Sequence, residues 1–304
     1  MNLSGTDAHE TITVDVYHML PFTMPSDPGV GNPATVVIVN PDQPISIQTM
    51  AYIARKLGQP ETVFTKQRHP GIWEVRWFTP GGNEINPGGN STVALGHLLA
   101  FHLEANQEII HIKSQYSWLD SSAQKQPNGM VQVTFPSVAP SYVEPTQKLL
   151  RAFNFKSTSF YKGDRDLIAI FPSELELRNF TPNYEELAEL RYFAVIAAAP
   201  GQNGLFGYRT FITTQGEIFE DIGSAGSLMN LASLFYPLLG QPTVMHADQL
   251  SALGGEAFCE LKGDKLFVSA FCDYFSGPNS FTFPMMGGEL LCQKGSCSDQ
   301  FIWI

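Results

Sequence analysis

Glu61 is the first residue whose setting suits acid–base chemistry, because it lies between Pro60 and the apolar β-type segment 62–64 (TVF). A carboxylate flanked in this way is often partly removed from water, and desolvation raises its pKa. A glutamate with a raised pKa is suited to act as a general acid or base near neutral pH. The sequence leaves a second interpretation open, in which Glu61 is an exposed glutamate at a strand edge.

Two glycine turns, residues 88–91 (GGNS) and 224–227 (SAGS), each precede a predicted helix. A helix start presents unpaired backbone N–H groups and a partial positive charge, and glycine lets a ligand approach that backbone closely. Two such ends facing each other across a cleft would bind an anion such as a carboxylate. The alternative is ordinary helix capping by Asn90, Ser91 and Ser227.

Glu220 and Asp221 come directly before the second glycine turn. We expect an acid there to serve as a second base or a positioning group, or simply to favour the helix start. His97 follows the first glycine turn by more than one helical turn, so it is too far along the helix to reach a ligand at that turn. We therefore assign His97 to packing.

Motifs of cofactor- and metal-dependent classes are absent. The sequence has no GxGxxG or GxxxxGK[ST] nucleotide loop and no GxSxG turn. Its cysteines form no CxxC pair, and no histidine cluster has metal-ligand spacing, so we expect reduced thiols, no metal and no cofactor. The cysteines are Cys259, Cys272, Cys292 and Cys297.

Charge and hydropathy narrow the class of partner. The 304 residues include 18 basic and 29 acidic ones, which gives a net charge of −11 and no basic stripe, so we expect no nucleic acid partner. The apolar runs are too short to span a bilayer, and residues 1–10 lack the apolar core of a signal peptide. We expect a soluble cytoplasmic protein that binds a small molecule rather than a membrane.

Short strands and a few helices recur along the chain in two successive sets. Ser46 is a predicted cap and Gly58 a predicted stop for a helix that ends near residue 57. Further helices are predicted at 91–103, 147–153, 184–190 and 227–238, and strands at 11–17, 34–39, 61–64, 73–78, 109–112, 130–135, 167–171, 193–198 and 206–213. Residues 21–33 are predicted to be a loop, 121–129 to be turn-rich, and 254–271 to be a hairpin.

An internal echo relates the two sets. Arg76-x-Phe78 precedes Glu84 and the first glycine turn, and Arg209-x-Phe211 precedes Glu217 and the second, with the same spacing from arginine to glutamate. Two copies favour two lobes, and small-molecule sites tend to lie between lobes. We expect lobes at 1–135 and 136–284, with the tail at about 285–304 a candidate to complete the first lobe.

Five motifs in order resemble the phenazine-biosynthesis-like isomerases over about residues 12–240. They are VDV at 14–16 followed by GNPATVV at 31–37, ETVF at 61–64, RWFTP at 76–80, Glu84 followed by GGNST at 88–92, and ED at 220–221 followed by GS at 226–227. Their counterparts in the family are a DxF-type strand with GNPAAV, ETxF, RWFTP, CGHAT or AGHPT, and EDPVTGSA.

The resemblance implies an α/β (α+β) diaminopimelate-epimerase-like fold. Each of two pseudo-symmetric lobes wraps a sheet around a central helix, here residues 91–103 and 227–239. It also implies a cofactor-free isomerase, often a homodimer. By position, Glu61 would be the acid or base and Asp221 would position the substrate. The substrate-binding set implied at the two helix starts is Gly89, Asn90, Ser91, Gly226 and Ser227, where Ser227 and the two glycine backbones hold the anionic group.

Departures from the family pattern bear on the reaction. Asn90 stands where the family has histidine, and asparagine cannot relay a proton near neutral pH. The two catalytic thiols of diaminopimelate epimerases would fall at Gly88 and Ala225, so two-thiol racemisation is excluded. The turn before Ser227 has one residue more than the family motif, which affects how Asp221 is placed.

Two classes of function remain from the sequence. The first is an isomerase or cyclase that acts on a small conjugated or carboxylate-bearing metabolite, by proton transfer through Glu61 or by holding one reactive conformer. The second is a binding module on an enzyme fold, for which the loss of the histidine is the argument.

Overall fold

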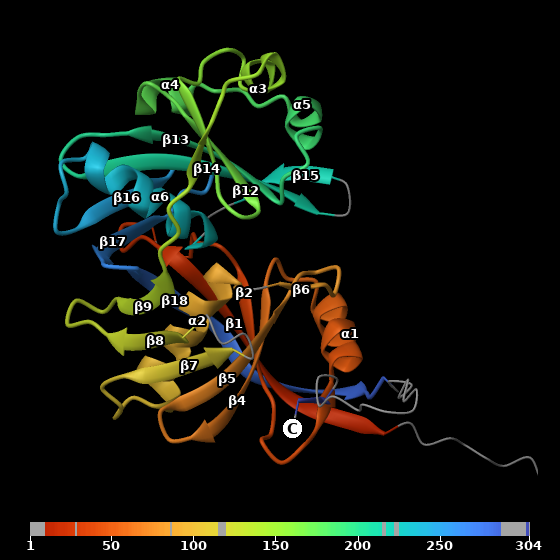
Figure 1. The fold of residues 1–304 in the computed structure, drawn as a ribbon. Helices are drawn as coiled ribbons and strands as arrows, with labels where there is room; N and C mark the ends of the chain where they lie inside the picture. The colour runs from red at the N-terminus through yellow and green to blue at the C-terminus, as the bar shows by residue number, and fades with distance from the viewer. Residues whose placement is uncertain are drawn as a thin grey trace, which may run out of the picture.

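The computed structural model describes residues 10–27, 29–85, 87–114, 120–214, 217–221, 225–286 and 302–303. Figure 1 shows two lobes, one above the other, with the first half of the chain in the lower lobe and most of the second half in the upper lobe. Both lobes are rich in strands and contain few helices. The architecture is the α/β class that the sequence indicates.

The first lobe contains a long opening strand and a set of shorter ones. Its strands are β1 (Thr11–Thr23), β2 (Ala34–Ile38), β3 (Ile45–Ser46), β4 (Thr62–His69), β5 (Ile72–Phe78), β6 (Glu84–Ile85), β7 (Ile110–Ser114), β8 (Asp120–Lys125) and β9 (Val131–Pro136). Its helices are α1 (Ile47–Leu57) and α2 (Gly89–Leu98), and the π-helical turn η1 (Leu99–Leu103) extends α2.

The second lobe carries more helices on its outer side. Its strands are β10 (Ser141–Val143), β11 (Ser159–Lys162), β12 (Asp166–Ile170), β13 (Ala194–Pro200), β14 (Leu205–Thr214), β15 (Glu217–Glu220), β16 (Met245–Gln249) and β17 (Glu256–Lys262). Its helices are α3 (Gln147–Ala152), α4 (Glu174–Arg178), α5 (Tyr184–Ala188) and α6 (Ala225–Leu238). The chain then continues into β18 (Lys265–Pro284) and β19 (Ile302–Trp303).

The two lobes repeat one arrangement of strands. β2 is parallel to β4 in the first lobe, as β12 is parallel to β13 in the second. The next hairpin in each lobe, β5–β6 or β14–β15, pairs Phe78 with Glu84 or Phe211 with Glu220. The strand pairing therefore contains the repeat that the sequence echo suggested.

An arginine–glutamate ion pair marks the same place in both hairpins. Arg76 Nε lies 2.9 Å from Glu84 Oε1, and Arg209 Nε lies 2.7 Å from Glu220 Oε1. The sequence echo, which matched Glu84 with Glu217, is therefore wrong in register. The second hairpin is longer than the first, so a later glutamate reaches the pairing position.

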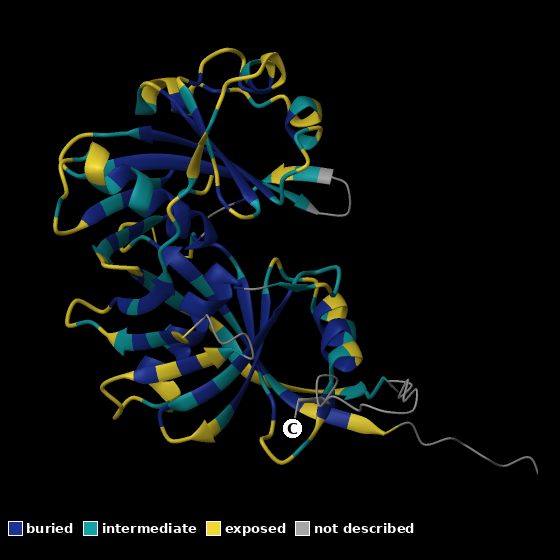
Figure 2. Ribbon diagram, in the orientation of Figure 1, coloured by how far each residue is buried: buried dark blue, intermediate teal, exposed yellow. Residues whose placement is uncertain are grey.

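The central helices are α2 and α6. Every residue of α2 except His97 is buried, and so is every residue of α6 from Ala225 to Ala232. A helix that is buried on all sides belongs in a core. Figure 2 shows buried residues at the centre of both lobes and exposed residues on the outer helices α3 to α5. The predicted helices at 91–103 and 227–239 are confirmed, with starts at Gly89 and Ala225.

Strand β18 joins the two lobes into one sheet. Its first part, from Lys265, pairs with β17 and β9, and its second part, from Phe271 to Pro284, pairs with β1 of the first lobe. The chain thus returns to the first lobe before the boundary expected at residue 284. β19 pairs with β3, which also places residues 302–303 against the first lobe.

Helix caps and stops in the sequence explain why the ends of some elements could be predicted. Ser46 Oγ accepts a hydrogen bond from Thr49 N at 3.1 Å, and Gly58 ends α1 in the left-handed conformation with φ 62°, so the predicted cap and stop are confirmed. Residues 120–125 form β8 rather than a turn, because Ser121 and Ala123 alternate inward with exposed or half-buried neighbours. Within the described residues, no helix has both the length and the apolar character needed to cross a membrane.

Candidate active site

Glu61 lies at the meeting point of a strand end and a helix start. It directly precedes β4, and its backbone oxygen accepts a hydrogen bond from Thr35 N of β2. Its carboxylate oxygen Oε2 accepts two hydrogen bonds from Ser91 of α2, one from the backbone N–H at 2.8 Å and one from Oγ at 2.9 Å. Since Gly88 has no side chain to cap this helix, Glu61 caps it from another part of the chain.

Opposing effects set the pKa of Glu61. Burial raises the pKa, while hydrogen bonds from Ser91, the charge of Arg165 and the backbone of Asn90 lower it, and the net direction is upward. The residue remains partly exposed, unlike Asn90 and Ser91, which are buried. A carboxyl that is held in a fixed orientation and has a raised pKa can accept a proton and return it.

Asn90 caps the helix of the other lobe. Its side-chain oxygen Oδ1 accepts a hydrogen bond from Ala225 N at 2.9 Å, so a residue of α2 satisfies the first backbone N–H of α6. This is a helix-capping role, as the alternative interpretation of the sequence held, but it acts between the lobes. A histidine at this position would offer different hydrogen-bonding atoms. The asparagine that departs from the family pattern is therefore the residue that makes this contact between the lobes.

The two helix starts touch each other. A Cβ atom placed on Gly89 would lie 2.5 Å from Gly226 N and 2.9 Å from the carbonyl carbon of Ala225, so only glycine fits there. The expectation of two ends facing each other across a cleft therefore needs correction at this point, where α2 and α6 are in contact. Ser227 is buried, and its Oγ lies 2.8 Å from Thr210 Oγ1.

Asp221 is a buried residue tied to both lobes. Its Oδ1 accepts a hydrogen bond from Asn32 Nδ2 at 3.0 Å. Its backbone donates to Thr210 O at 2.8 Å and accepts from Gln249 Nε2 at 3.1 Å. The extra residue noted in the following turn falls among residues 222–224, as does Ser224, and these lie outside the described residues.

The structure brings most of the predicted site residues into one junction between the lobes. Glu61 and Ser91 are bonded to each other, Asn90 is bonded to Ala225, and Gly89 packs on Gly226. Sequence reasoning did not single out Asn32 as a partner of Asp221, although it belongs to the GNPATVV motif. It also gave no signal for Arg165, whose contribution appears only in three dimensions.

The two described cysteines are buried free thiols. Groups of three or more potential metal ligands are lacking in the described part of the chain. Cys259 and Cys272 are buried, and burial raises the pKa of the Cys259 thiol to about 12 and also raises that of Cys272, so both stay protonated. Cys292 and Cys297 lie outside the described residues.

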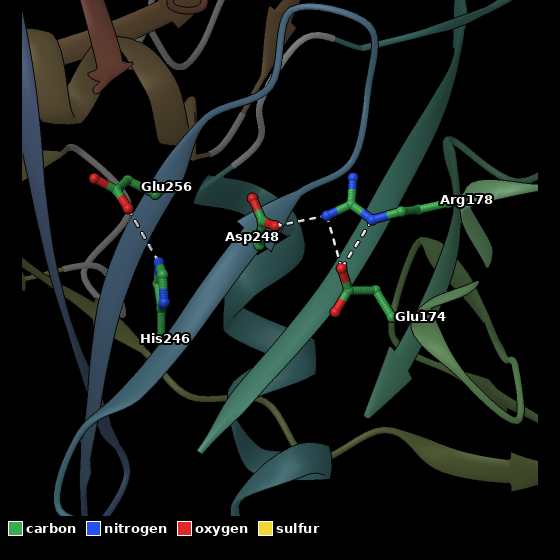
Figure 3. A network of polar contacts seen from close by, with 5 residues as sticks. All are labelled: Glu174, Arg178, His246, Asp248 and Glu256. Atoms are coloured by element: carbon green, nitrogen blue, oxygen red, sulfur yellow. Dashed lines mark hydrogen bonds and ion pairs between the residues drawn. The ribbon is translucent and has the colours of Figure 1, made fainter. Parts of the chain in front are cut away.

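Other polar groups belong to the scaffold. His97 stacks on Phe101 with ring centroids 4.5 Å apart, and burial lowers its pKa to about 4, in agreement with the predicted packing role. In the second lobe, Figure 3 shows a network between α4 and the neighbouring strands β16 and β17. The network joins Arg178 to Glu174 and Asp248, and His246 to Glu256.

Sequence comparison gives a match over most of this chain. Residues 22–236 match the family described as phenazine biosynthesis-like protein. An uncharacterized isomerase of Pseudomonas aeruginosa is 27% identical over 256 residues, which cover 84% of this chain and 92% of that protein. These matches include the region of Glu61, α2, Asp221 and the start of α6.

Solved structures share the fold. A phenazine biosynthesis protein of the PhzF family from Enterococcus faecalis superposes with a TM-score of 0.77 at 25% identity, covering 90% of this chain and 99% of that chain. A predicted epimerase from Pseudomonas aeruginosa superposes with a TM-score of 0.65 at 13% identity, covering 90% of this chain and 100% of that chain. The second likeness shows that the fold is epimerase-like.

Proposed function

We propose that this chain, which belongs to the phenazine biosynthesis-like protein family, is an isomerase that moves a proton within a small metabolite through Glu61. Its curated relatives carry the name isomerase, which supports the reaction class but no substrate. The observation that carries the proposal is the Glu61 carboxyl, which is bonded twice to Ser91 at the helix start and whose pKa is raised by burial.

The proposed reaction needs one proton carrier. Ionised Glu61 accepts a proton from a carbon of the substrate, and the electron pair of the broken C–H bond enters the conjugated system. The protonated carboxyl then returns the proton to another carbon, so the product has the same mass as the substrate. Burial that raises the pKa of Glu61 strengthens it as a base in the first step and brings its two protonation states closer in free energy.

Neighbouring residues take positioning roles in this proposal. Ser91 holds Oε2 of Glu61 through two hydrogen bonds and so fixes the orientation of the carboxyl group. Asp221 orients the substrate from the second lobe, with Asn32 fixing its carboxylate. Gly89 and Gly226 position the two helix starts against each other, and the N–H of Ala225 is already bonded to Asn90.

A second candidate function follows from Asn90. Because its side chain is engaged in capping α6, it gives Glu61 no proton relay. An enzyme without a relay can work by holding one conformer of its substrate, as a cyclase or pericyclic catalyst does, and a chain that has lost catalysis can serve as a binding module. Both alternatives would leave the function independent of the Glu61 proton.

Metabolite profiles of cells with the gene intact, deleted or carrying Glu61→Gln test the proposal. Glu61→Gln keeps the side-chain shape but cannot carry the proton, and the exposed Glu176→Gln serves as control. The isomerase is supported if one compound disappears in the deletion and Glu61→Gln strains while an isomer of equal mass accumulates. A change in the deletion strain alone would support the cyclase, and unchanged profiles in all strains would support a binding module.

A further inference from the structure

We propose that Arg165 is a specificity-determining residue that binds a carboxylate group of the substrate from the second lobe, opposite Glu61. This inference rests on the proposed function, because it assigns a substrate class to the same site. It is carried by the place of Arg165 at the beginning of a parallel strand pair, by the contacts that fix its side chain, and by its charge.

Arg165 and Glu61 lie at the same end of the parallel strand pair of their own lobe, but on different strands: Arg165 precedes the first strand of its pair, and Glu61 precedes the second. In the first lobe Thr35 pairs with Thr62, and Glu61 directly precedes this parallel pair. In the second lobe Asp166 pairs with Ala194 in the same parallel arrangement, directly after Arg165. Both Glu61 and Arg165 therefore lie where a parallel strand pair begins.

Each of these strand starts is also bonded to the central helix of its own lobe. Glu61 binds Ser91 of α2, whereas Asp166 Oδ2 accepts a hydrogen bond from Asn230 Nδ2 of α6 at 3.1 Å. The helix starts themselves are in contact through Gly89. The two strand starts are thus linked through the central helices, with Asn230 lying just over one turn from the start of α6.

Contacts within the second lobe hold the Arg165 side chain in place. Its guanidinium carbon lies 4.4 Å from the ring centroid of Phe193, whose backbone N–H donates to Arg165 O. Its Nε lies 3.5 Å from Asp166 Oδ1. An arginine stacked on a ring and oriented by a carboxylate loses little freedom when it binds a ligand.

Part of the Arg165 side chain remains accessible to a ligand. About a third of the Arg165 side chain (33%) is exposed, while Asp166 beside it is buried. Arginine presents paired N–H donors that match the two oxygens of a carboxylate. The Asp166 contact uses the Nε side of the guanidinium, so the terminal nitrogens are the ones assigned to the substrate.

The positive charge of Arg165 lowers the pKa of Glu61, the proposed proton carrier. Although burial sets the upward direction of the Glu61 pKa, Arg165 opposes it from the other lobe. The ion pairs among the described residues do not include one between Arg165 and Glu61. A substrate carboxylate on Arg165 would neutralise this charge and make Glu61 a stronger base while the substrate is bound.

Benzoate and benzamide are suitable probes, because they share a ring and differ in charge. Binding to wild type, Arg165→Gln, Arg165→Lys and Arg178→Gln is followed by NMR titration, with thermal unfolding as the check on folding. We expect wild type to prefer benzoate and Arg165→Gln to lose about tenfold of its affinity for benzoate, with benzamide unaffected. Arg165→Lys should retain part of the preference, and Arg178→Gln, in the network of Figure 3, should retain all of it.

Glu61→Gln separates this inference from the proposed function. It should abolish isomerisation but keep the preference for benzoate, because it leaves Arg165 in place. Equal binding of benzoate and benzamide by wild type would overturn the assignment of Arg165, as would an unchanged preference in a folded Arg165→Gln protein. Loss of isomerase activity has no bearing on either of those results.

Discussion

Ionisation of Glu61 lowers the free energy of unfolding. Because burial raises its pKa in the folded state, the folded protein binds this proton more tightly than the unfolded chain does. Its contribution to stability is therefore greatest at low pH and is lost as the pH rises through the folded pKa. We expect Glu61→Gln to unfold a few degrees higher than wild type near neutral pH, and the difference to vanish as the pH falls.

Thermal unfolding followed by circular dichroism across that pH range measures this effect. The exposed Glu176→Gln change removes the same charge outside the junction and should leave the pH dependence of stability unchanged. A Glu61→Gln protein that is less stable than wild type near neutral pH would show that the hydrogen bonds from Ser91 outweigh burial.

Ser91 offers a second test at the level of one side chain. Ser91→Ala removes the Oγ hydrogen bond to Glu61 and should cost about 1.5–3 kcal/mol of unfolding free energy, as expected for a bond to a charged group. The change should also raise the pKa of Glu61. Activity should therefore fall at a higher pH than in wild type when the solution is acidified. Chemical denaturation and the pH profile of isomerisation measure the two effects.

Ser227→Ala is the matched control, since Ser227 occupies the corresponding place at the start of α6. Its Oγ bonds to the neutral hydroxyl of Thr210. We expect a cost of about 1 kcal/mol and no shift of the acidic limb. Equal shifts in the two variants would contradict the specific link between Ser91 and Glu61.

The contact between helices α2 and α6 depends on Gly89. A methyl group there meets backbone atoms of Gly226 and Ala225 that cannot rotate away, so Gly89→Ala must push the helix starts apart. We expect a loss of about 1–3 kcal/mol in unfolding free energy together with reduced activity per folded molecule. Denaturant titration and a metabolite assay of the folded variant check both.

Gly96→Ala provides the comparison on the same helix. The added methyl group meets side chains, with Val133 Cγ2 at 2.8 Å and Ala123 Cβ at 3.1 Å, well along α2 from its start. It should destabilise the protein yet leave activity per folded molecule intact. If both alanine variants lose activity equally, the helix contact has no special role in the site.

Elements with strong local signals were predictable from the sequence. Ser46 and Gly58 mark the ends of α1 because caps and stops act through neighbouring backbone groups. β18 was not predictable at its full length, because its pairing with β1 depends on a partner more than two hundred residues away in sequence. The ion pair of Arg209 was missed for a similar reason, since hairpin length is a three-dimensional property.

Residue type alone was enough to nominate part of the candidate site. Glu61 could be chosen because a carboxylate in an apolar context suits proton transfer, and Ser91 because it opens a helix. The capping of Ala225 by Asn90 and the bond between Asn32 and Asp221 could not be derived, because each joins residues from different lobes. Arg165 likewise becomes meaningful only when the lobes are placed together.

The whole molecule has features of one cooperative unit. β18 runs through both lobes, and one buried apolar cluster contains residues of both α2 and α6, such as Val93 and Leu228. Fluorescence reports on the first lobe, since no tryptophan occurs between residues 136 and 284, whereas circular dichroism reports on both lobes. We expect the two signals to give one coincident unfolding transition, and separate midpoints would show that the lobes unfold independently.

The hydrogen bond between Asn32 and Asp221 tests the link between the lobes most directly. The two residues are 1% and 6% exposed, and Asn32→Asp would place a second carboxyl 3.0 Å from the first in this buried contact. Two such carboxyls cannot both ionise cheaply, so they share a proton and the pKa of the pair rises. Stability is then retained at low pH and lost as the pH rises, by about 2–4 kcal/mol near neutral pH.

Asn32→Ala separates loss of the hydrogen bond from the added charge, because it should lower stability by an amount that hardly changes with pH. Denaturant titration at several pH values, followed by fluorescence and circular dichroism together, makes the measurement. For Asn32→Asp both signals should move together, since the contact joins the two lobes. If the fluorescence midpoint moves while the circular dichroism trace separates into two transitions, one of them at the wild-type midpoint, the lobes are held together by β18 and the helix contact rather than by this buried pair.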